Sequence, residues 1–320
     1  MSLVAPSIED VRSAQLRVSK IAARTPLVRY QGDTASAEIH LKLENLQPIG
    51  SFKLRGAANA MALLDEEVLA DGVYTASAGN MAQGVAWCAR ARGVRCRVIV
   101  PEHAPQTKTS AIERLGGEVI RVPFDEWWRA LVERSHPAGR GHFIHPFADT
   151  AVMAGNGTIG LEIFGDLADV DAIIVPYGGG GLACGIAAVA HALSPRTRVY
   201  AVEADTAAPL TASLAAGEPT AVTRTPTFID GMGSGGLFAE MWPLVRSLLA
   251  GTMVVSVADV AAAVRLLAER NRVVAEGAGA AALAAALNGP LDGQRVVCIV
   301  SGGNIDAAVL AAILRGDMPP

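Results

Sequence analysis

A single lysine stands inside an apolar, helix-forming stretch that reads GSFKLRGA from Gly50 to Ala57. A turn with Pro48 and Gly50 precedes this lysine, apolar residues at helical spacing follow it, and Ser51 is a candidate N-cap. Lys53 therefore falls in the first turn of a predicted helix, where the positive end of the helix dipole favours the neutral amine. A neutral amine attacks carbonyl groups, although most lysines at helix starts are surface side chains. Lys53 becomes a catalytic candidate only if distant parts of the chain supply partners.

Three other loops follow a predicted strand, precede a predicted helix and contain small or polar residues. Backbone amides at a helix start bind carboxylates and phosphates, because they have no partner within the helix and the dipole is positive there. In open α/β sheets such loops gather at the carboxyl ends of the strands, where ligands bind. The three loops are Ser77-Ala78-Gly79-Asn80-Met81, Gly178-Gly179-Gly180-Gly181 and Ser301-Gly302-Gly303-Asn304.

The four consecutive glycines form the most specific of these loops. They lose much conformational entropy on folding and offer no side chain for packing, so a bound phosphate explains them better than a structural turn does. A second interpretation stays open. Gly178, Gly180 and Ala183 also match the loose G-x-G-x-x-A dinucleotide pattern, and Glu203 ends the next predicted strand, where a ribose-binding acid would stand. A nicotinamide-dependent dehydrogenase is therefore an alternative.

Glu276 is a further polar candidate, because it lies in an apolar setting just before a Gly/Ala-rich helix pattern. An exposed carboxylate at a helix start explains it nearly as well. Other kinds of site have less support, since the six histidines show no HExxH or comparable spacing and no GxSxG pattern occurs. We expect structural histidines, and neither a metal centre nor a serine hydrolase.

Composition and charge exclude several classes of protein. The 320 residues, 51% of them hydrophobic, can bury a large core, and the length predicts about two domains. Lys and Arg number 27 against 31 Asp and Glu, which gives a formal charge of −4, and no basic block indicates a nucleic acid or an anionic membrane as partner. We expect a small-molecule partner.

Localisation follows from the cysteines and the first residues. Four scattered cysteines without CxxC spacing predict reduced thiols, and the N-terminus lacks the basic and apolar regions of a signal peptide, so we expect a cytoplasmic protein. The uncharged stretch from Ala172 to Pro195 is long enough to cross a bilayer, but Pro176 and the four glycines interrupt it. We therefore expect no membrane association.

Short apolar runs alternate with helical patterns from Val73 onward, after an amphipathic first helix expected from Ser7 to Arg24. Ser7 and Asp10 have the spacing of a capping box. Strands that alternate with helices imply parallel sheets covered on both faces, so the fold class is α/β. The expected strands are Val73–Ala76, Arg95–Val100, Glu118–Val122, His142–His145, Asp171–Pro176, Arg198–Glu203, Thr252–Ser256 and Val296–Val300.

Five motifs, in this order, resemble those of the fold-type II pyridoxal-phosphate enzymes, most closely the threonine dehydratase and serine racemase group. The resemblance covers nearly all the chain and implies an α/β fold like that of the tryptophan synthase β chain, with two open, mostly parallel sheets flanked by helices. It further implies a large cofactor-binding domain from residues 1–67 and 150–320, a small mobile domain from residues 68–149, and a homodimer. The motifs are SFKLRGA at 51–57, SAGNMAQG at 77–84, GGGG at 178–181, EGAGA at 276–280 and SGGN at 301–304.

The resemblance implies roles for the candidate residues. Lys53 would hold pyridoxal 5'-phosphate as a Schiff base, with Phe52 beside the ring, and would remove the Cα proton of an L-β-hydroxy amino acid such as threonine or serine. The β-hydroxyl then leaves, and the enamine hydrolyses to a 2-oxo acid and ammonia. The other implied roles are the cofactor phosphate for Gly178, Gly179, Gly180 and Gly181, its phenolic oxygen for Asn80, its pyridine nitrogen for Ser301, the substrate carboxylate for Ser77, Ala78, Gly79, Asn80 and Met81, and a catalytic contribution for Ser77 and Glu276.

Three departures from the group refine this expectation. Ala78 stands where racemases have a second serine, and racemisation needs a proton donor on each face, so dehydration is favoured. Met81 stands where the group usually has histidine, which predicts a more apolar substrate side and a bulkier substrate. Some members bind a divalent cation through an acid matching Glu203 and a later Asp, but Pro209 occupies that later position. A metal at Glu203 is therefore only a weak alternative.

The chain also stops near Pro320 without the regulatory domain of biosynthetic threonine dehydratases, so feedback by isoleucine is not expected.

Other activities remain as alternatives beside dehydration. Within the group they are an amino-acid racemase and a β-replacement enzyme such as cysteine synthase, whose lysine motif usually differs. Outside it they are the nicotinamide-dependent dehydrogenase and an inactive binding module.

Overall fold

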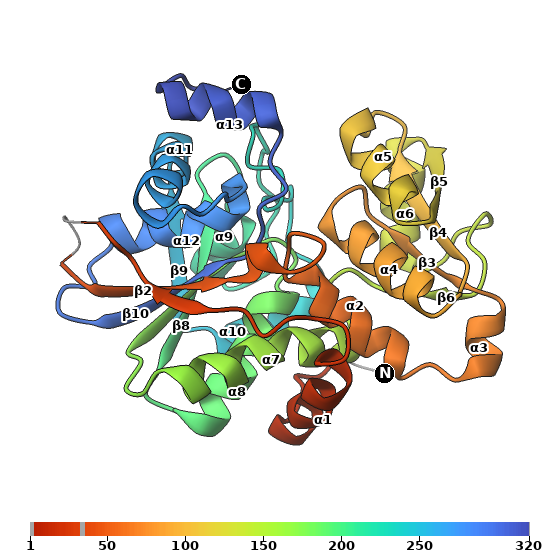
Figure 1. Ribbon diagram of the computed structural model, residues 1–320, viewed down its shortest axis with the longest axis horizontal. Helices are drawn as coiled ribbons and strands as arrows, with labels where there is room; N and C mark the ends of the chain where they lie inside the picture. Colours follow the sequence, from red (N-terminus) through yellow and green to blue (C-terminus); the bar gives the residue numbers. More distant parts are fainter. Residues whose placement is uncertain (1–2, 33–35, 320) are drawn as a thin grey trace.

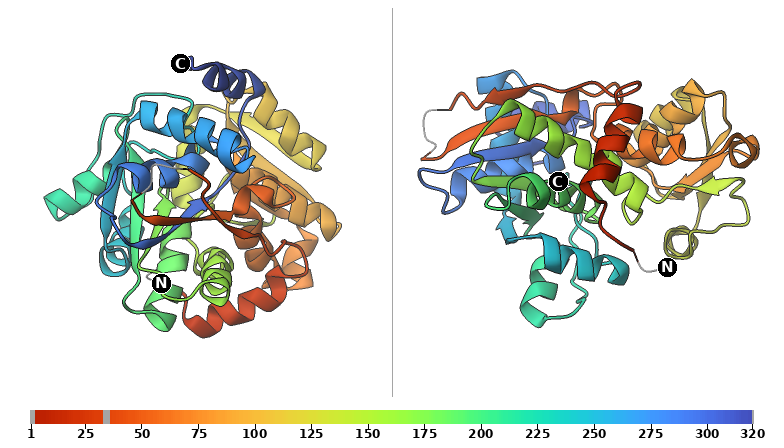
Figure 2. Two further views of the ribbon diagram at one scale, coloured as in Figure 1. Left: turned by 60° about the vertical axis from the view of Figure 1, so that its left-hand side comes forward. Right: turned by 90° about the horizontal axis from the view of Figure 1, so that it is seen from below.

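The computed structural model describes residues 3–32 and 36–319, and in that part of the chain two sheets form two lobes that lie side by side (Figures 1 and 2). The first sheet has six strands in the order β1-β2-β10-β7-β8-β9, with β1 antiparallel to β2 and the other pairs parallel. Its strands are β1 (Leu27–Arg29), β2 (Glu38–Leu43), β7 (Ala172–Pro176), β8 (Arg198–Ala204), β9 (Gly251–Val255) and β10 (Arg295–Val300).

The second sheet has four parallel strands in the order β5-β4-β3-β6. They are β3 (Val73–Ala76), β4 (Cys96–Pro101), β5 (Gly117–Val122) and β6 (His142–Phe143). Alternate residues of these strands face two apolar layers: Val73, Val98 and Val100 pack toward α4, while Tyr74 and Ile99 pack toward α6. Both faces of the sheet are therefore covered, as expected for parallel strands.

Helices cover both faces of the six-stranded sheet as well. α12 packs against four of its strands, with α11 and α13 outside it, and α8 packs on β7 and β8 with α7 and α10 beyond. The α-helices are α1 (Ile8–Val18), α2 (Lys53–Ala62), α3 (Glu66–Ala70), α4 (Asn80–Ala91), α5 (Gln106–Arg114), α6 (Phe124–Glu133), α7 (Thr150–Asp166), α8 (Gly181–Leu193), α9 (Pro209–Ala216), α10 (Trp242–Leu248), α11 (Val257–Leu266), α12 (Gly277–Asn288) and α13 (Ala307–Arg315). Two 3-10 helices, η1 (Glu44–Leu46) and η2 (Ala239–Met241), and one π-helix, η3 (Leu267–Asn271), accompany them.

Local sequence explains where several helices begin and end. The predicted capping box of Ser7 and Asp10 is present at α1, and Ser256 and Asp259 form another at α11. The first helix is shorter than predicted and ends at Val18. The prediction of Ser51 as an N-cap is wrong, because α2 begins at Lys53 and Ser51 instead forms a β-bridge with Gly302.

α2 connects the two lobes, because it packs both on α7 and on α4 (Figure 1). Glycines permit this close approach. A Cβ on Gly56 would lie 2.8 Å from the Asn156 side chain, and one on Gly84 would lie 3.2 Å from the Lys53 carbonyl oxygen. The helix that carries Lys53 is thus held by close contacts on two sides.

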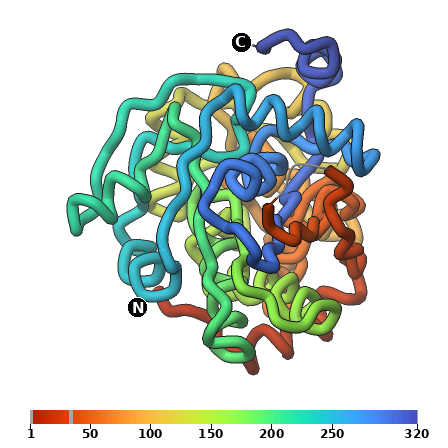
Figure 3. The backbone as a smooth tube through the Cα atoms, turned by 90° about the vertical axis from the view of Figure 1, so that its left-hand side faces the viewer, coloured from red at the N-terminus to blue at the C-terminus, as the bar shows by residue number. Residues whose placement is uncertain are grey.

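The predicted fold class is confirmed, and the predicted strands lie where they were expected to within about one residue, except that β6 stops at Phe143. The division into a large domain and a small mobile domain stays a prediction, although the four-stranded sheet falls within residues 68–149. The four cysteines are free and buried. In the described ranges no helix is long and apolar enough to cross a membrane. The first described residues and α13 lie at separate places on the surface (Figure 3).

Candidate active site

Lys53 is the first residue of α2, and its Nζ donates a hydrogen bond of 2.7 Å to the Pro146 carbonyl oxygen. The ammonium lies 5.2 Å from the centre of the Phe52 ring. Burial lowers the pKa of Lys53 to about 8, while the charge of Glu276 opposes that shift. The expected depression of the lysine pKa is therefore present, but burial causes it. A substantial part of the amine is neutral near pH 8.

Two loops are joined by backbone contacts beside Lys53. Phe52 N donates to the Ser301 carbonyl oxygen at 3.0 Å, Gly303 N donates to the Gly50 carbonyl oxygen at 2.9 Å, and Ser51 bridges Gly302. Gly50 has a φ of +72°, and a Cβ there would lie 2.6 Å from Asn304 Oδ1, so glycine is required. These contacts fix the predicted lysine loop against the carboxyl end of β10.

The Gly178–Gly181 loop follows β7 and starts α8. Gly180 has a φ of +89° and is the N-cap, and within the described part of the chain no side chain caps this helix. A Cβ on Gly181 would lie 2.6 Å from the Phe147 carbonyl oxygen, and a Cβ on Gly179 would enter the Phe147 ring. The first amides of α8 are left to a ligand, and the positive end of the helix dipole favours an anion there. The loop thus fits a phosphate group.

The Ser77–Met81 loop follows β3 and starts α4 in the four-stranded sheet. Its N-cap is Gly79, whose amide donates to Ser77 Oγ at 3.2 Å, and no capping side chain occurs among the described residues. The first amides of α4 therefore fit a carboxylate. Met81 is 1% exposed and packs in the apolar cluster between α4 and α2. Its side chain lies in the core, so its predicted effect on substrate choice stays a prediction.

Asn80 brings three of the predicted site segments together. Its Nδ2 donates to Glu276 Oε1 at 2.9 Å, and its Oδ1 accepts from Asn304 Nδ2 at 2.7 Å. Asn304 Nδ2 also donates to the Ile49 carbonyl oxygen at 2.8 Å, next to the lysine loop. The sequence motifs around residues 53, 80, 276 and 301 therefore meet in space, although they come from both sheets.

Glu276 is the N-cap of α12, and its backbone N donates to the Gly302 carbonyl oxygen at 3.0 Å. The side chain is 7% exposed. Burial raises its pKa to about 7, the charge of Asp230 raises it further, and the hydrogen bond from Asn80 and the charge of Lys108 oppose the shift. The interpretation of Glu276 as an exposed capping carboxylate is wrong, and its carboxyl group titrates near neutral pH.

Sequence reasoning missed the turn at His145, Pro146 and Phe147. His145 is 1% exposed, and its Nδ1 accepts from the amides of Phe147 at 3.3 Å and Ala148 at 2.8 Å. This turn presents the Pro146 carbonyl oxygen to Lys53 and the Phe147 ring to the glycine loop. The histidine was expected to be structural, and its contacts agree. The local pattern contains no signal that the turn faces Lys53.

Glu203 has a structural task. Its two carboxylate oxygens accept from the Leu210 amide at 2.9 Å, the Thr211 amide at 2.8 Å and Thr211 Oγ1 at 2.7 Å, so it caps α9. These bonds leave it unsuited to the ribose or metal alternatives. Within residues 3–32 and 36–319 no group of three His, Cys, Asp or Glu side chains is arranged to hold a metal.

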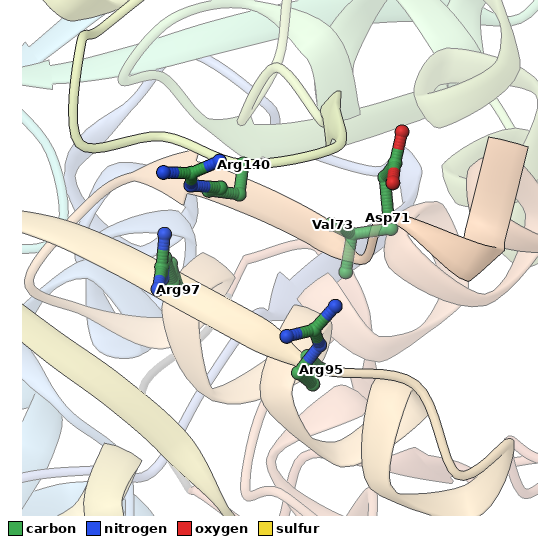
Figure 4. Close-up of a pocket in the computed structure, with 5 residues that line it drawn as sticks. All are labelled: Asp71, Val73, Arg95, Arg97 and Arg140. Carbon is green, nitrogen blue, oxygen red and sulfur yellow. The ribbon is translucent and has the colours of Figure 1, made fainter.

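Figure 4 shows a separate pocket, which lies where β3 and β4 begin. It is lined by Asp71, Val73, Arg95, Arg97 and Arg140. Val73 begins β3, whereas Ser77 follows the carboxyl end of the same strand. The pocket is therefore not part of the candidate active site.

The residues present fit pyridoxal phosphate. The start of α8 offers amides to the phosphate, Lys53 offers a partly neutral amine to the aldehyde, and Asn80 and Ser301 are polar residues on the two loops that are tied to the lysine loop. The Oγ of Ser51, next to this set, is buried without a hydrogen-bond partner among the described residues. An unpartnered buried hydroxyl indicates a place where a polar ligand completes the structure.

Known proteins resemble this chain over nearly its whole length. The family model for pyridoxal-phosphate dependent enzymes matches residues 18–302. The L-threonine ammonia-lyase of Thermotoga maritima is 39% identical over 315 residues, which is 97% of this chain and 78% of that protein. The catabolic L-threonine dehydratase TdcB of Escherichia coli K12 is 38% identical, over 96% of this chain and 95% of that protein.

Solved structures are also similar to this chain over nearly its whole length. The processed form of threonine deaminase isoform 2 from Solanum lycopersicum aligns with a TM-score of 0.86 and 32% identity, over 98% of this chain and 91% of that one. Maize serine racemase aligns with a TM-score of 0.88 and 32% identity, over 98% of each chain. Both lyases and a racemase are therefore similar to this chain.

Proposed function

The chain belongs to the family of pyridoxal-phosphate dependent enzymes, and we propose that it is an ammonia-lyase for an L-β-hydroxy amino acid, with threonine as the first candidate. The substrate loses its Cα proton and its β-hydroxyl as water. The enamine that remains takes up water again and yields a 2-oxo acid and ammonia. Relatives named L-threonine ammonia-lyase or L-threonine dehydratase support this reaction. They are 35–40% identical to this chain over most of its length, which supports assigning their activity to it.

Lys53 and the two uncapped helix starts carry the chemistry in this proposal. The amides of Gly178–Gly181 bind the cofactor phosphate, and those at the start of α4 bind the substrate carboxylate. The bound cofactor supplies an electron sink for the negative charge that develops at Cα. Lys53 Nζ takes the Cα proton, which its lowered pKa permits near neutral pH.

The polar groups around the ring tune this reaction. Asn80 would hold the phenolic oxygen of the cofactor, and the Ser301 hydroxyl would hold its pyridine nitrogen. A hydroxyl there, unlike a carboxylate, would not favour a protonated nitrogen, which would limit charge delocalisation and favour rapid loss of the β-hydroxyl. Glu276, with a pKa of about 7, exchanges a proton near the substrate's polar groups.

The observation that carries the proposal is the meeting of Lys53, Asn80, Glu276 and Ser301 at the carboxyl ends of strands from both sheets. A racemase is the second candidate, because maize serine racemase is similar in structure. Ala78 argues against it. This methyl group provides no proton on the face opposite Lys53, and racemisation needs one there.

Absorbance and a substrate panel test the proposal. We expect purified enzyme to show a yellow band that borohydride bleaches and that Lys53→Ala cannot form. Threonine, serine and phenylserine are then assayed for 2-oxo acid and for the opposite enantiomer. Release of 2-oxo acid without enantiomer exchange supports the lyase, whereas exchange alone supports the racemase. A colourless protein after incubation with pyridoxal phosphate would contradict both.

The proposal also covers the localisation, the oligomeric state and the domain movement of the protein. We propose a cytoplasmic homodimer, and a small domain of residues 68–149 that moves against the rest of the chain when substrate binds. Light scattering measures the mass of the particle. Hydrogen exchange with and without substrate measures whether the four-stranded sheet changes protection as a unit.

A further inference from the structure

A long connection without helix or strand joins α9 to η2, and its middle part, Phe228–Met232, lies against the active site. We refer to Phe228–Met232 as the cover segment. A Cβ on Gly231 would lie 3.3 Å from Glu276 Oε1, and the Gly231 carbonyl oxygen is 3.4 Å from the Cβ position of Gly178. Ile229 Cα is 3.0 Å from the Cβ position of Gly277. The cover segment therefore contacts both the buried carboxyl group and the start of the glycine loop.

An ion pair ties the cover segment to the other lobe. Asp230 pairs with Lys108, which lies on α5 beside the four-stranded sheet, while the cover segment belongs to the lobe of the six-stranded sheet (Figure 1). Both side chains are partly exposed, Lys108 at 30% and Asp230 at 46%. Lys108 lies outside the set of residues that contact cofactor or substrate in the proposed reaction.

A second ion pair ties the same connection farther along. Arg134 at the end of α6 pairs with Glu240 in η2 at 2.8 Å and also donates to the Ala148 carbonyl oxygen at 2.8 Å. The four-stranded lobe thus holds the connection at Asp230, next to the Gly231 that contacts Glu276, and holds η2, where the connection ends.

The charges of the first pair reach Glu276. Asp230 raises and Lys108 lowers the pKa of Glu276, so their effects oppose each other. Other groups that act on the Glu276 carboxyl group are Lys53 from α2, the neutral side chain of Asn80 from α4 and the backbone amide of Asn304. Losing one partner of the pair therefore disturbs both the position of the cover segment and the charge beside Glu276.

We propose that Lys108 is a positioning residue whose ion pair with Asp230 holds the cover segment closed over Glu276 and the glycine loop. This rests on the proposed function, because the closed cover is what retains the amino-acid substrate. Lys108 acts through Asp230 and touches no reacting atom. When the pair is broken, the closed form is less populated, and the apparent affinity for substrate falls by the same factor.

Charge reversal and a charge swap in the holoenzyme test the proposal. Lys108→Asp and Asp230→Lys are each expected to raise KM for threonine by about tenfold with a smaller change in kcat, and the double variant is expected to return within about threefold of wild type. The yellow band remains in all three. Lys108→Gln, which removes the pair without adding repulsion, should show a smaller rise in KM.

Arg97→Glu is the matched control. Arg97 is 28% exposed and pairs with Glu118 at 2.8 Å, but this pair stays within the four-stranded sheet. We expect KM and kcat of this variant to stay within about twofold of wild type. A general effect of charge reversal on the lobe would change Arg97→Glu as much as Lys108→Asp and would overturn the proposal.

Trypsin cleavage after Arg224 provides a readout that does not depend on the reaction. Arg224 lies in the same connection, just before the cover segment. We expect faster cleavage there in both single reversals and wild-type rates in the swap. If wild type makes no 2-oxo acid but the cleavage follows this pattern, the proposed function fails and the role of the ion pair stands. If neither KM nor cleavage changes in the single reversals, or the swap restores neither, the proposed role of the ion pair is wrong.

Discussion

Two sets of buried or partly buried charged side chains each have a member near the start of α2, and they behave in opposite ways. The first, which we call the ion cluster, consists of Lys42, Glu44, Arg55 and Glu162, each at most 5% exposed. The second is the active-site pair of Lys53 and Glu276. Arg55 and Lys53 are two residues apart on α2, so the same helix carries a member of each set.

Every charge in the ion cluster has an opposite charge in contact. Arg55 pairs with Glu44 at 2.8 Å and with Glu162 at 2.7 Å, and Lys42 pairs with Glu162 at 2.6 Å. Burial raises the pKa of Glu44, but the charge and hydrogen bonds of its partners, chiefly Arg55, lower it by more, so the net shift is downward. The pKa of Arg55 is raised by its two carboxylate partners, so Glu44 and Arg55 keep their charges over a wide range of pH.

The active-site pair lacks such contacts. Lys53 Nζ donates to a neutral carbonyl oxygen, and Glu276 accepts from the neutral amide of Asn80. Burial therefore dominates, and the two pKa values move toward each other, to about 8 and about 7. Burial moves a pKa toward neutrality at Lys53 and Glu276, which have no ion-pair contact. It does not do so at Glu44, because the contact with Arg55 outweighs it.

Lys53→Met and Arg55→Met have the largest expected effects. Arg55→Met leaves two buried carboxylates with a single cation, so the free energy of unfolding falls by about 3–5 kcal/mol. Lys53→Met removes a partly buried amine that has no ion pair, so stability is kept, while the rate of 2-oxo acid formation falls on the order of 10²–10⁴-fold. Denaturant unfolding and the product assay are run on both proteins. Arg55→Met as stable as wild type would contradict the contrast.

Glu276→Gln changes the pH dependence of stability in the apoenzyme. The folded pKa of Glu276 lies near 7, above its ordinary value of 4.5, so its contribution to stability is present below pH 4.5 and is lost as the pH rises to 7. The variant lacks this loss. Between about pH 4.5 and pH 7.5 wild type should lose about 3 kcal/mol relative to Glu276→Gln.

Glu44→Gln is the control for that experiment. The folded pKa of Glu44 is lowered, so its ionised form stabilises the protein above its unfolded pKa, and the contribution is lost as the pH falls. The two variants should therefore change stability at neutral pH with opposite sign. Equal signs would show that pairing does not separate the two sets.

The reaction of Lys53 with pyridoxal phosphate gives a smaller effect. Only the neutral amine reacts, so the rate at which the yellow band forms in the apoenzyme should rise with pH through about 8. Glu276 raises the pKa of Lys53, so Glu276→Gln should move this midpoint downward by up to about one pH unit. Stopped-flow absorbance across pH measures it. An upward move would exclude the charge of Glu276 as the cause.

Two buried hydroxyls provide the smallest test. Thr158 Oγ1 accepts from Arg55 Nη1 at 3.1 Å, so Thr158→Val should lower the free energy of unfolding by about 1–2 kcal/mol. Ser51 Oγ, on the lysine loop, has no hydrogen-bond partner in the described part of the chain. Ser51→Ala should therefore change the free energy of unfolding by less than about 0.5 kcal/mol. Thermal unfolding of both apoproteins compares them. Similar losses would mean that Ser51 is satisfied in solution.

Much of the fold was readable from local patterns. Strand β3 and the alternation that follows it were predicted almost to the residue, because buried parallel strands and amphipathic helices each leave a periodic trace. Helix ends were harder. Ser51 looked like an N-cap, but its backbone is used in the bridge to Gly302, a distant partner that no local pattern reveals.

The candidate site divides in the same way. The motifs around Lys53, Ser77, Gly178 and Ser301 were visible because glycine and polar residues between a strand and a helix are locally unusual. Glu203 matched the pattern of a ribose-binding acid but caps α9, because a carboxylate at a strand end has the same local pattern in both cases. Met81 is buried in the apolar cluster shared by α2 and α4, and its effect on the substrate side stays a prediction.

Local sequence was enough to establish that one lysine begins a helix, that four glycines open another, and that the glycines follow a strand of an α/β fold. The tertiary contacts were needed to show that Arg55 has two carboxylate partners while Lys53, two residues earlier, faces the Pro146 carbonyl oxygen. They were also needed to show that Asp230 and Lys108 meet above Glu276. The two levels differ because a pKa depends on burial and on nearby charges, and both come from segments that are far apart in the chain.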